Sequence, residues 1–194
     1  MKKVKATNEN QKRPSVIAIA FLFSLLIPLI GYIYTGPLIA FLFLLGYLGG
    51  FALWLLVPRQ TLWSSIRVPY WTAFAIYLFL HKVEENRMKF FEVLGDKITG
   101  IPVPEVTPLL ILGLLVLPLG SWLLIPYLVK HKRPLGYFLA WTFFTSFAVV
   151  ESAHFVFPLL TGEPYGYFPG MASAIILVPA GLWGMYRLWK GKVK

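Results

Sequence analysis

The sequence predicts an all-α membrane protein, a polytopic helical bundle with about six transmembrane helices and both termini in the cytoplasm. The first observation is composition: of 194 residues, 58% are apolar and 13% are charged, whereas soluble domains carry about 45 to 50% and about 25%. The second is that the apolar residues form stretches of about 20, the length of a membrane-spanning helix. The third is the uneven distribution of the 18 Lys and Arg among the loops.

The spans follow from these stretches in order. Residues 1–14 form a basic cytoplasmic arm, and the apolar stretch after them is a span rather than a signal peptide, because it is too long and lacks a small-residue cleavage site. Gly36-Pro37 predicts a tight turn between the first two spans. A single transmembrane domain (15–189) then holds six spans, at about 15–34, 36–57, 68–85, 106–129, 135–157 and 168–189, and a basic tail (190–194) follows.

Three features qualify individual spans. Pro118 and Pro126 are expected to kink the fourth span. Gly46 and Gly50 form a G-x-x-x-G on the second, which permits close helix contact. The loop 86–105 mixes apolar and charged residues, so it either lies flat as a lid at the interface or continues the third helix.

The basic residues fix the predicted orientation. Fourteen of the 18 Lys and Arg lie in the two termini and the loops after the second and fourth spans, and four lie in the loop region after the third. Positive residues near span ends remain in the cytoplasm. The net charge of +10 therefore marks one face of a cell membrane and predicts contact with membrane lipids, with no nucleic-acid partner.

Two mirrored motifs carry the candidate chemistry. His81 and Glu84 form an H-x-x-E with Glu85 adjacent, and Glu151 and His154 form an E-x-x-H. Residues three or four apart share a helix face, with Cβ atoms about 5 to 6 Å apart. Both predicted helices run outward, and both motifs lie roughly 20 to 28 Å above the inner helix end. A shared site in the outer leaflet is therefore expected.

This residue set predicts a metal centre. The chain has no cysteine, so a metal must be held by His and carboxylates, as zinc and non-haem iron can be. We expect His81, Glu84, Glu151 and His154 to be the metal ligands. Glu85 is the expected general base, although the roles of the two adjacent carboxylates can be exchanged. Tyr77, one turn before His81, is a candidate proton donor.

Simpler explanations exist for each motif alone. The H-x-x-E can be an ordinary solvated helix end, because Lys82, Asn86 and Arg87 follow His81 closely. The E-x-x-H can be a buried hydrogen-bonded pair that joins helices. The equal depth of the two motifs favours the shared site.

The pattern LHKVEEN, Leu80 to Asn86, resembles the HXXEE family of small integral membrane proteins. The resemblance extends over about residues 70–189, through a second His-containing helix (ESAHFVFPLL) and a Tyr-x-Pro-Gly turn before the last span. The expected form of this turn is Tyr-Asn-Pro-Gly, and in this chain Phe168 occupies the position of the Asn. The polar side chain at that position is therefore missing. The resemblance implies that the His and Glu residues of the two motifs form the site, but it does not indicate which reaction takes place there.

Three functions remain open. The first is a membrane-embedded zinc or iron enzyme that acts on a lipid or isoprenoid substrate from the outer leaflet. The second is a metal-free acid/base isomerase or cyclase, similar in layout to the emopamil-binding type. The third is a proton- or cation-coupled transporter that uses Glu151 and His154 as a relay.

Overall fold

Helices make up most of the described chain. The computed structural model describes residues 13–57 and 61–191, and these ranges contain no strand. Several of the shorter helices continue directly into π-helical or 3-10-helical segments (η). In chain order the elements are α1 (Pro14–Leu56), α2 (Trp63–Ile76), η1 (Tyr77–His81), α3 (Lys82–Arg87), α4 (Phe90–Leu94), η2 (Gly95–Thr99), α5 (Pro108–Leu110), η3 (Ile111–Val116), α6 (Leu117–Leu123), α7 (Ile125–Lys130), α8 (Pro134–Thr145), η4 (Ser146–Val150), η5 (Glu151–Phe155), α9 (Phe157–Leu160) and α10 (Met171–Lys190).

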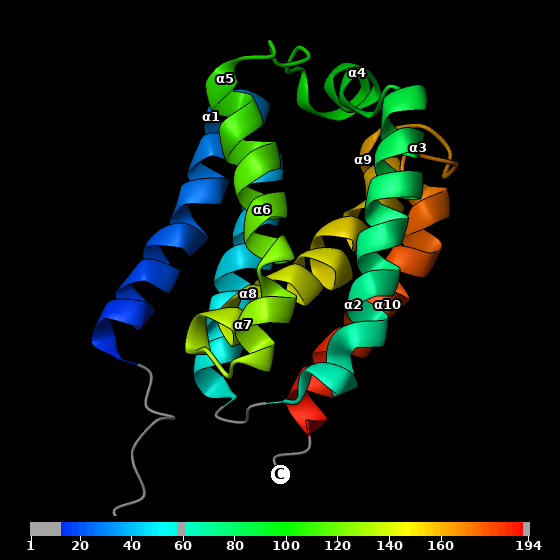
Figure 1. Cartoon of the computed structure of the whole chain (residues 1–194). Helices are drawn as coiled ribbons and strands as arrows, with labels where there is room; N and C mark the ends of the chain where they lie inside the picture. Colours follow the sequence, from blue (N-terminus) through cyan, green and yellow to red (C-terminus); the bar gives the residue numbers. More distant parts are fainter. Residues whose placement is uncertain (1–12, 58–60, 192–194) are drawn as a thin grey trace, which may run out of the picture.

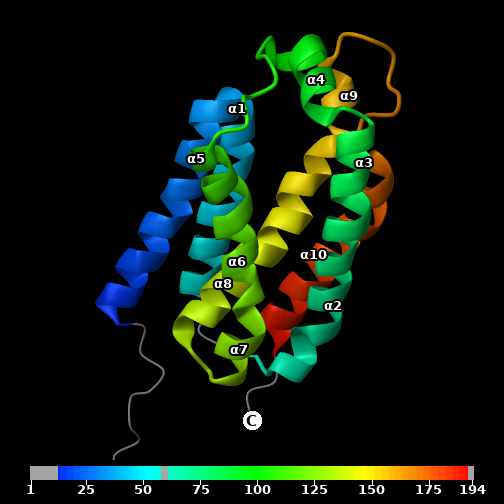
Figure 2. The ribbon, with the colours of Figure 1, turned by 45° about the horizontal axis from the view of Figure 1, so that its top comes forward.

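Helix α1 consists of two antiparallel legs. Gly36 breaks the helix with φ 77° and ψ −176°, a conformation that favours glycine because it has no Cβ. The rings of Phe21 and Phe51 are 5.7 Å apart and those of Phe23 and Tyr47 are 6.0 Å apart. Such pairs, on either side of residue 36, require the second leg to run back along the first, as Figures 1 and 2 show. The predicted turn at Gly36 is present.

Four helical stretches are long and apolar enough to cross a membrane. They are Pro14–Leu56, Pro108–Lys130, Pro134–Phe155 and Met171–Lys190. The segments α2, η1 and α3 form a further column beside α10 (Figure 1). This column begins at Trp63 rather than at the predicted residue 68, because Pro69 fits inside the early helix. The last helix begins at Met171 rather than at 168, because Gly170 has a left-handed backbone.

The stretch Pro134–Phe155 is the centre of the bundle. Of its most apolar 18-residue window, 78% is buried, against 22 to 39% in the other three stretches. Its aromatic rings point to all sides, and Phe138, Phe143, Phe144 and Phe147 are fully buried. The second leg of α1 approaches α8 closely at Gly50, where a Cβ would lie 2.6 Å from Thr142 Cα. The G-x-x-x-G glycine therefore serves close helix packing.

Proline interrupts the stretch Pro108–Lys130, as expected from its sequence. The backbone of Leu124 separates α6 from α7 directly before Ile125-Pro126. The π-helical segment η3 ends at Val116, just before Pro118. Each proline removes one backbone N–H and so weakens the regular helical ladder at that point.

The turns alternate between two ends of the bundle (Figure 2). One, the basic end, contains the starts of α1, α2 and α8 and the ends of α7 and α10, with Arg13, Arg67, Lys130, Lys132, Arg133, Arg187 and Lys190. The other, which we name the acidic end, contains the Gly36 break and the segments 88–107 and 156–170, with four acids (Glu92, Asp96, Glu105 and Glu163) against two lysines (Lys89 and Lys97). Residues 1–12, 58–60 and 192–194, which include most of the predicted arm and tail, lie outside the described residues.

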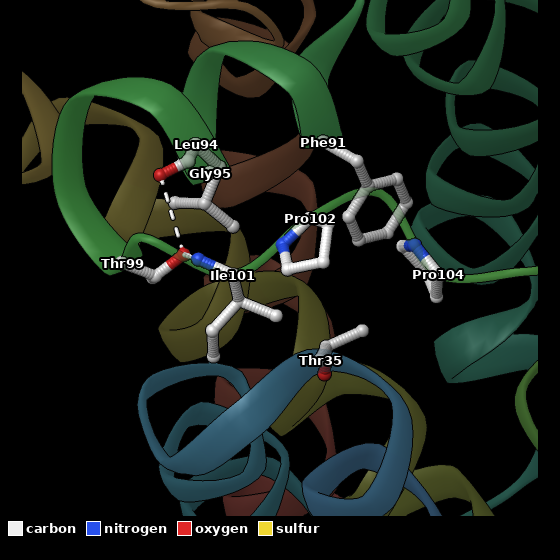
Figure 3. A pocket seen from close by; sticks show the side chains of 8 residues that line it. All are labelled: Thr35, Phe91, Leu94, Gly95, Thr99, Ile101, Pro102 and Pro104. Atoms are coloured by element: carbon white, nitrogen blue, oxygen red, sulfur yellow. Dashed lines mark hydrogen bonds between the residues drawn. The ribbon is translucent and has the colours of Figure 1, made fainter.

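The segment 88–107 covers the acidic end and does not continue α3. Lys89 adopts φ 55°, which ends α3 and turns the chain into α4. Ile101 and Pro102 then lie over Thr35 at the tip of the α1 hairpin (Figure 3). The space between them is about 10 Å³, room for at most one water molecule. This segment therefore closes the top of the bundle, the arrangement expected of a lid.

Candidate functional site

Both predicted motifs lie on irregular helical backbone near the acidic end. His81 ends the π-helical segment η1, and Glu85 follows one turn later on α3. Glu151 and His154 lie together on the 3-10-helical segment η5, directly after the π-helical η4. Single turns of π-helix often mark functional positions, because they change which side chains face a neighbouring helix.

Four side chains from these segments converge in one cluster, which we name the His/Glu nest: His81, Glu85, Glu151 and His154. His81 Nε2 lies 2.8 Å from Glu151 Oε2 and 3.3 Å from Glu85 Oε1. His154 Nε2 lies 3.3 Å from Glu151 Oε2 and 3.6 Å from Glu85 Oε1. The two histidines are 0% and 3% exposed and each glutamate is 9% exposed. The nest is therefore enclosed by protein.

The hydrogen bonds of Ser173 determine which nitrogen of His81 faces the nest. Ser173 Oγ donates a short hydrogen bond to Glu84 Oε2. A hydroxyl has one proton to donate, so the Oγ must accept the 2.8 Å hydrogen bond from His81 Nδ1. A neutral imidazole protonated at Nδ1 has its lone pair on Nε2. Nε2 is therefore the nitrogen that faces the nest, and it is free to bind a metal whenever the ring is neutral.

His154 has the same arrangement with a different partner. Its Nδ1 lies 2.6 Å from the carbonyl oxygen of Pro169, which can only accept a hydrogen bond. Nδ1 therefore carries a proton, and Nε2 is the nitrogen that faces the nest. Gly170 makes this approach possible, since a Cβ there would lie 2.3 Å from His154 Cε1, and its φ of 93° also favours glycine. The Pro169-Gly170 turn is thus part of the site.

Glu84 lies outside the nest and binds the start of α10. One oxygen accepts hydrogen bonds from the Tyr167 hydroxyl at 2.5 Å and from the Ala172 N–H at 3.0 Å. The other accepts from the Ser173 N–H at 2.8 Å and from its hydroxyl. A carboxylate at a helix N-terminus satisfies free backbone donors and interacts well with the helix dipole. Glu84 holds Ser173 in place and, through it, His81.

Glu85 is held from outside the nest by a cation. Its Oε2 pairs with Lys82 Nζ at 2.5 Å, while its Oε1 faces the two imidazoles. The ammonium also lies over the ring of Tyr77, 4.9 Å from the centroid. Tyr77 in turn stacks on His81, with the ring centroids 5.9 Å apart. Lys82 therefore fixes the orientation of Glu85 and closes one side of the site.

Aromatic rings close the other side. The rings of Phe90 and Phe157 lie 5.1 and 5.7 Å from the His154 ring. Phe90 belongs to α4, so the segment that covers the acidic end also covers the nest. An apolar surround lowers the local dielectric, which strengthens interactions between the charges inside.

The donor set fits a divalent cation. One ligand atom each from His81, Glu85 and His154 lies within 4.8 Å of the others, and Glu151 Oε2 lies still closer to the two imidazole Nε2 atoms, at 2.8 and 3.3 Å. Ligands at the Zn–N and Zn–O distances of about 2.0 to 2.1 Å in a tetrahedral site are about 3.3 Å apart, and the four nest distances range from 2.8 to 3.6 Å. His81 Nε2 is also buried without a hydrogen bond of acceptable geometry among the described residues. Such an atom requires a partner.

The sequence-predicted residues divide into two groups. His81, Glu85, Glu151 and His154 come together, and Tyr77 contacts the cluster through its ring. The expected ligand Glu84 is directed instead to the start of α10, because Glu85, at i+4 from His81, is the carboxylate that faces the same side as the imidazole. The placement of Glu84 among the nest ligands is therefore corrected.

Three partners were not predicted. They are Ser173, Lys82 and the Pro169 carbonyl group. For Pro169 a signal existed in the Tyr-x-Pro-Gly turn, whereas Ser173 is one of many small residues in apolar helices and carries no signal of its own.

Fold and nest together define a helical protein with four helices able to cross a membrane and a buried His/Glu cluster near one end. Comparison with models of protein families, with curated proteins and with solved structures yields no match.

Proposed function

We propose that the chain is a multi-pass protein of the cell membrane with six spans, and that the basic end faces the cytoplasm. Six crossings are supported by the two legs of α1, the α2–α3 column and the three other apolar stretches, each of which supplies one. The basic residues at one end of the bundle support the orientation. The LHKVEEN and Tyr-x-Pro-Gly sequences support membership of the HXXEE family.

The nest is the binding site of a catalytic zinc or iron ion. The observation that carries this proposal is the convergence of two imidazole Nε2 atoms, each freed by a hydrogen bond at Nδ1, with two carboxylates. Such Nδ1 partners are typical of metal-binding histidines. Bound there, the ion would act as a Lewis acid and lower the pKa of a water molecule.

The residues of the nest have different roles. Glu151 is the carboxylate ligand beside His81 and His154, because its oxygen lies closer to both Nε2 atoms than that of Glu85. Glu85 takes up the proton as general base, with Lys82 fixing its second oxygen. Two histidines and one carboxylate leave coordination positions open, as a catalytic site requires. The substrate is a lipid or isoprenoid from the leaflet at the acidic end.

Metal analysis of the purified protein tests this function. Wild-type protein is expected to hold about one zinc or iron per chain, and a His81→Ala, His154→Ala double variant of equal stability is expected to hold less than a tenth of that. His131→Ala is the matched control, because His131 lies between α7 and α8 at the basic end. Absence of metal in wild type after incubation with Zn²⁺ or Fe²⁺ refutes the metal proposal.

A metal-free acid/base enzyme is the second candidate. The separation of 2.8 Å between His81 Nε2 and Glu151 Oε2 favours it, because a protonated imidazole and a carboxylate pair at this distance. His81 would then donate a proton to a substrate double bond while a glutamate removes another. Activity that survives exhaustive chelation identifies this candidate.

A further inference from the structure

A groove runs along the side of the bundle between α3 and the first turns of α10. These two segments lie side by side in both views of the chain (Figures 1 and 2). The groove has a volume of about 450 Å³, within the range of about 300 to 1,000 Å³ of small-molecule sites. Its lining residues are Phe79, Leu80, Val83, Glu84, Arg87, Met88, Tyr167, Ala172, Ser173 and Ile176.

The polarity of the groove changes along its length. Phe79, Val83 and Arg87 follow one another along η1 and α3, and all three line the groove. Phe79 is 72% exposed and lies toward the middle of the bundle, whereas Arg87 ends α3 at the acidic end. On α10, Ile176 lies deeper than Ala172. The groove is apolar toward the middle of the membrane and polar toward its surface, as a lipid molecule is.

Arg87 is the unpaired cation of this end. Among the described residues it has no carboxylate within 4.0 Å, whereas the other cations of this region are paired, as Lys82 with Glu85, Lys89 with Glu92 and Lys97 with Glu163. Glu84 also lines the groove, but both of its oxygens accept hydrogen bonds from the α10 side. The free charge at the polar end of the groove is therefore positive.

We propose that this groove binds a lipid with a phosphate headgroup, with the phosphate on Arg87 and an acyl or prenyl chain along Phe79, Val83 and Ile176. Guanidinium groups bind phosphate through paired charge-assisted hydrogen bonds. Ser173 lines the groove and accepts a hydrogen bond from His81 Nδ1, so the groove adjoins the wall of the nest. The inference rests on the proposed function, since it names the class of lipid on which the site acts.

Lipid binding by purified protein in an uncharged detergent tests the proposal, with native mass spectrometry as the readout. The probes are dioleoyl phosphatidic acid and dioleoyl glycerol, which share their chains and differ in the phosphate. Wild type is expected to bind the phosphatidic acid at least tenfold more tightly. Arg87→Gln is expected to lower the affinity for phosphatidic acid about tenfold, because one charge-assisted contact is lost.

Two further variants locate the binding. Ile176→Trp fills the apolar part of the groove at a half-exposed position and is expected to weaken both probes. Lys89→Gln removes an exposed cation outside the groove and is expected to change neither. Equal affinity for the two probes, or an Arg87→Gln variant with wild-type affinity, overturns the proposal.

Metal content of the same samples separates this proposal from the proposed function. Arg87→Gln and Ile176→Trp leave the nest residues intact, so both are expected to keep the wild-type metal content. Phosphate-dependent lipid binding without any metal supports the groove and refutes the metal centre. Metal without phosphate-dependent binding refutes the groove alone.

Discussion

His81 Nε2 and Glu151 Oε2 lie 2.8 Å apart, although they belong to helical columns that are not consecutive in the chain. Both atoms are buried. Burial of polar and ionisable groups is unfavourable unless each has a partner, and a group that has lost its partner is more unfavourable still. Each of the two groups therefore supplies the partner that the other needs when buried, at a cost that apolar residues in the same helix contact would not carry.

The three glutamates are expected to differ in their effect on metal binding. Glu151→Gln should reduce metal affinity most, because its oxygen is nearest to both imidazoles. Glu85→Gln should have a smaller effect, and Glu84→Gln should lower affinity about 10- to 100-fold through loss of the Ser173 contact. Competition with a chromophoric chelator measures all three. A Glu84→Gln effect larger than that of Glu151→Gln contradicts the assignment.

Ser173→Ala tests the indirect support of His81. The variant removes the acceptor of the Nδ1 proton and is expected to weaken metal binding about tenfold, the lower range for loss of such a partner. Ser152→Ala is the matched control, because the Ser152 hydroxyl donates to the Val149 carbonyl of its own helix. Equal metal affinity of the two variants would show that Ser173 has only a packing role.

Gly170→Ala should disrupt the site and the fold together. The added Cβ would lie 2.3 Å from the His154 ring, and the φ of 93° is strained for alanine. We expect a loss of more than about 2 kcal/mol in unfolding free energy, with reduced metal content. Gly162→Ala has φ 72° with no atom within 4 Å of its Cβ, so it should cost only about 1 kcal/mol. Denaturation in detergent measures the unfolding free energy of both variants. Equal losses would contradict the close approach of Gly170 to the His154 ring.

The Tyr167 phenol gives a pH-dependent signal of the Glu84 contact. Partial desolvation, together with the hydrogen bond to and the charge of Glu84, raises its pKa from 10.0 to about 12. The folded protein keeps this proton where the unfolded chain has lost it, so the stabilisation is present below pH 10 and is lost as pH rises through about 12. The tyrosinate absorbance of wild type minus that of Tyr167→Phe should therefore rise near pH 12. A rise near pH 10 would show that the contact is absent.

Much of the fold was predictable because the local signals were strong. Gly36-Pro37 marks the hairpin, since the turn needs the positive φ that glycine supplies. The start of α2 was predicted too late, because Pro69 is tolerated within the first turns of the helix. The start of α10 was predicted too early, because the Pro169-Gly170 turn comes before its first residue. Helix ends depend on such local contacts.

The sequence was sufficient to predict which helices form the site, but not which side chains face it. Matching depth correctly paired His81 with Glu151 and His154. The choice between Glu84 and Glu85 depends on a rotation of a fraction of a turn, and the π-helical segment Tyr77–His81 alters that rotation. The contact of Ser173 with Glu84 depends on the packing of the start of α10 beside α3. No local sequence pattern indicates that packing.

X-ray absorption spectroscopy of the purified protein at the zinc and iron edges shows whether the His/Glu nest binds a metal and through which atoms. We expect a single metal bound by two imidazole nitrogens and at least one carboxylate oxygen, with no sulfur ligand. Loss of the imidazole signal in the His81→Ala, His154→Ala variant would complete the assignment. No metal edge in wild type supplemented with Zn²⁺ or Fe²⁺, or a metal without imidazole ligands, would refute the metal site in the His/Glu nest.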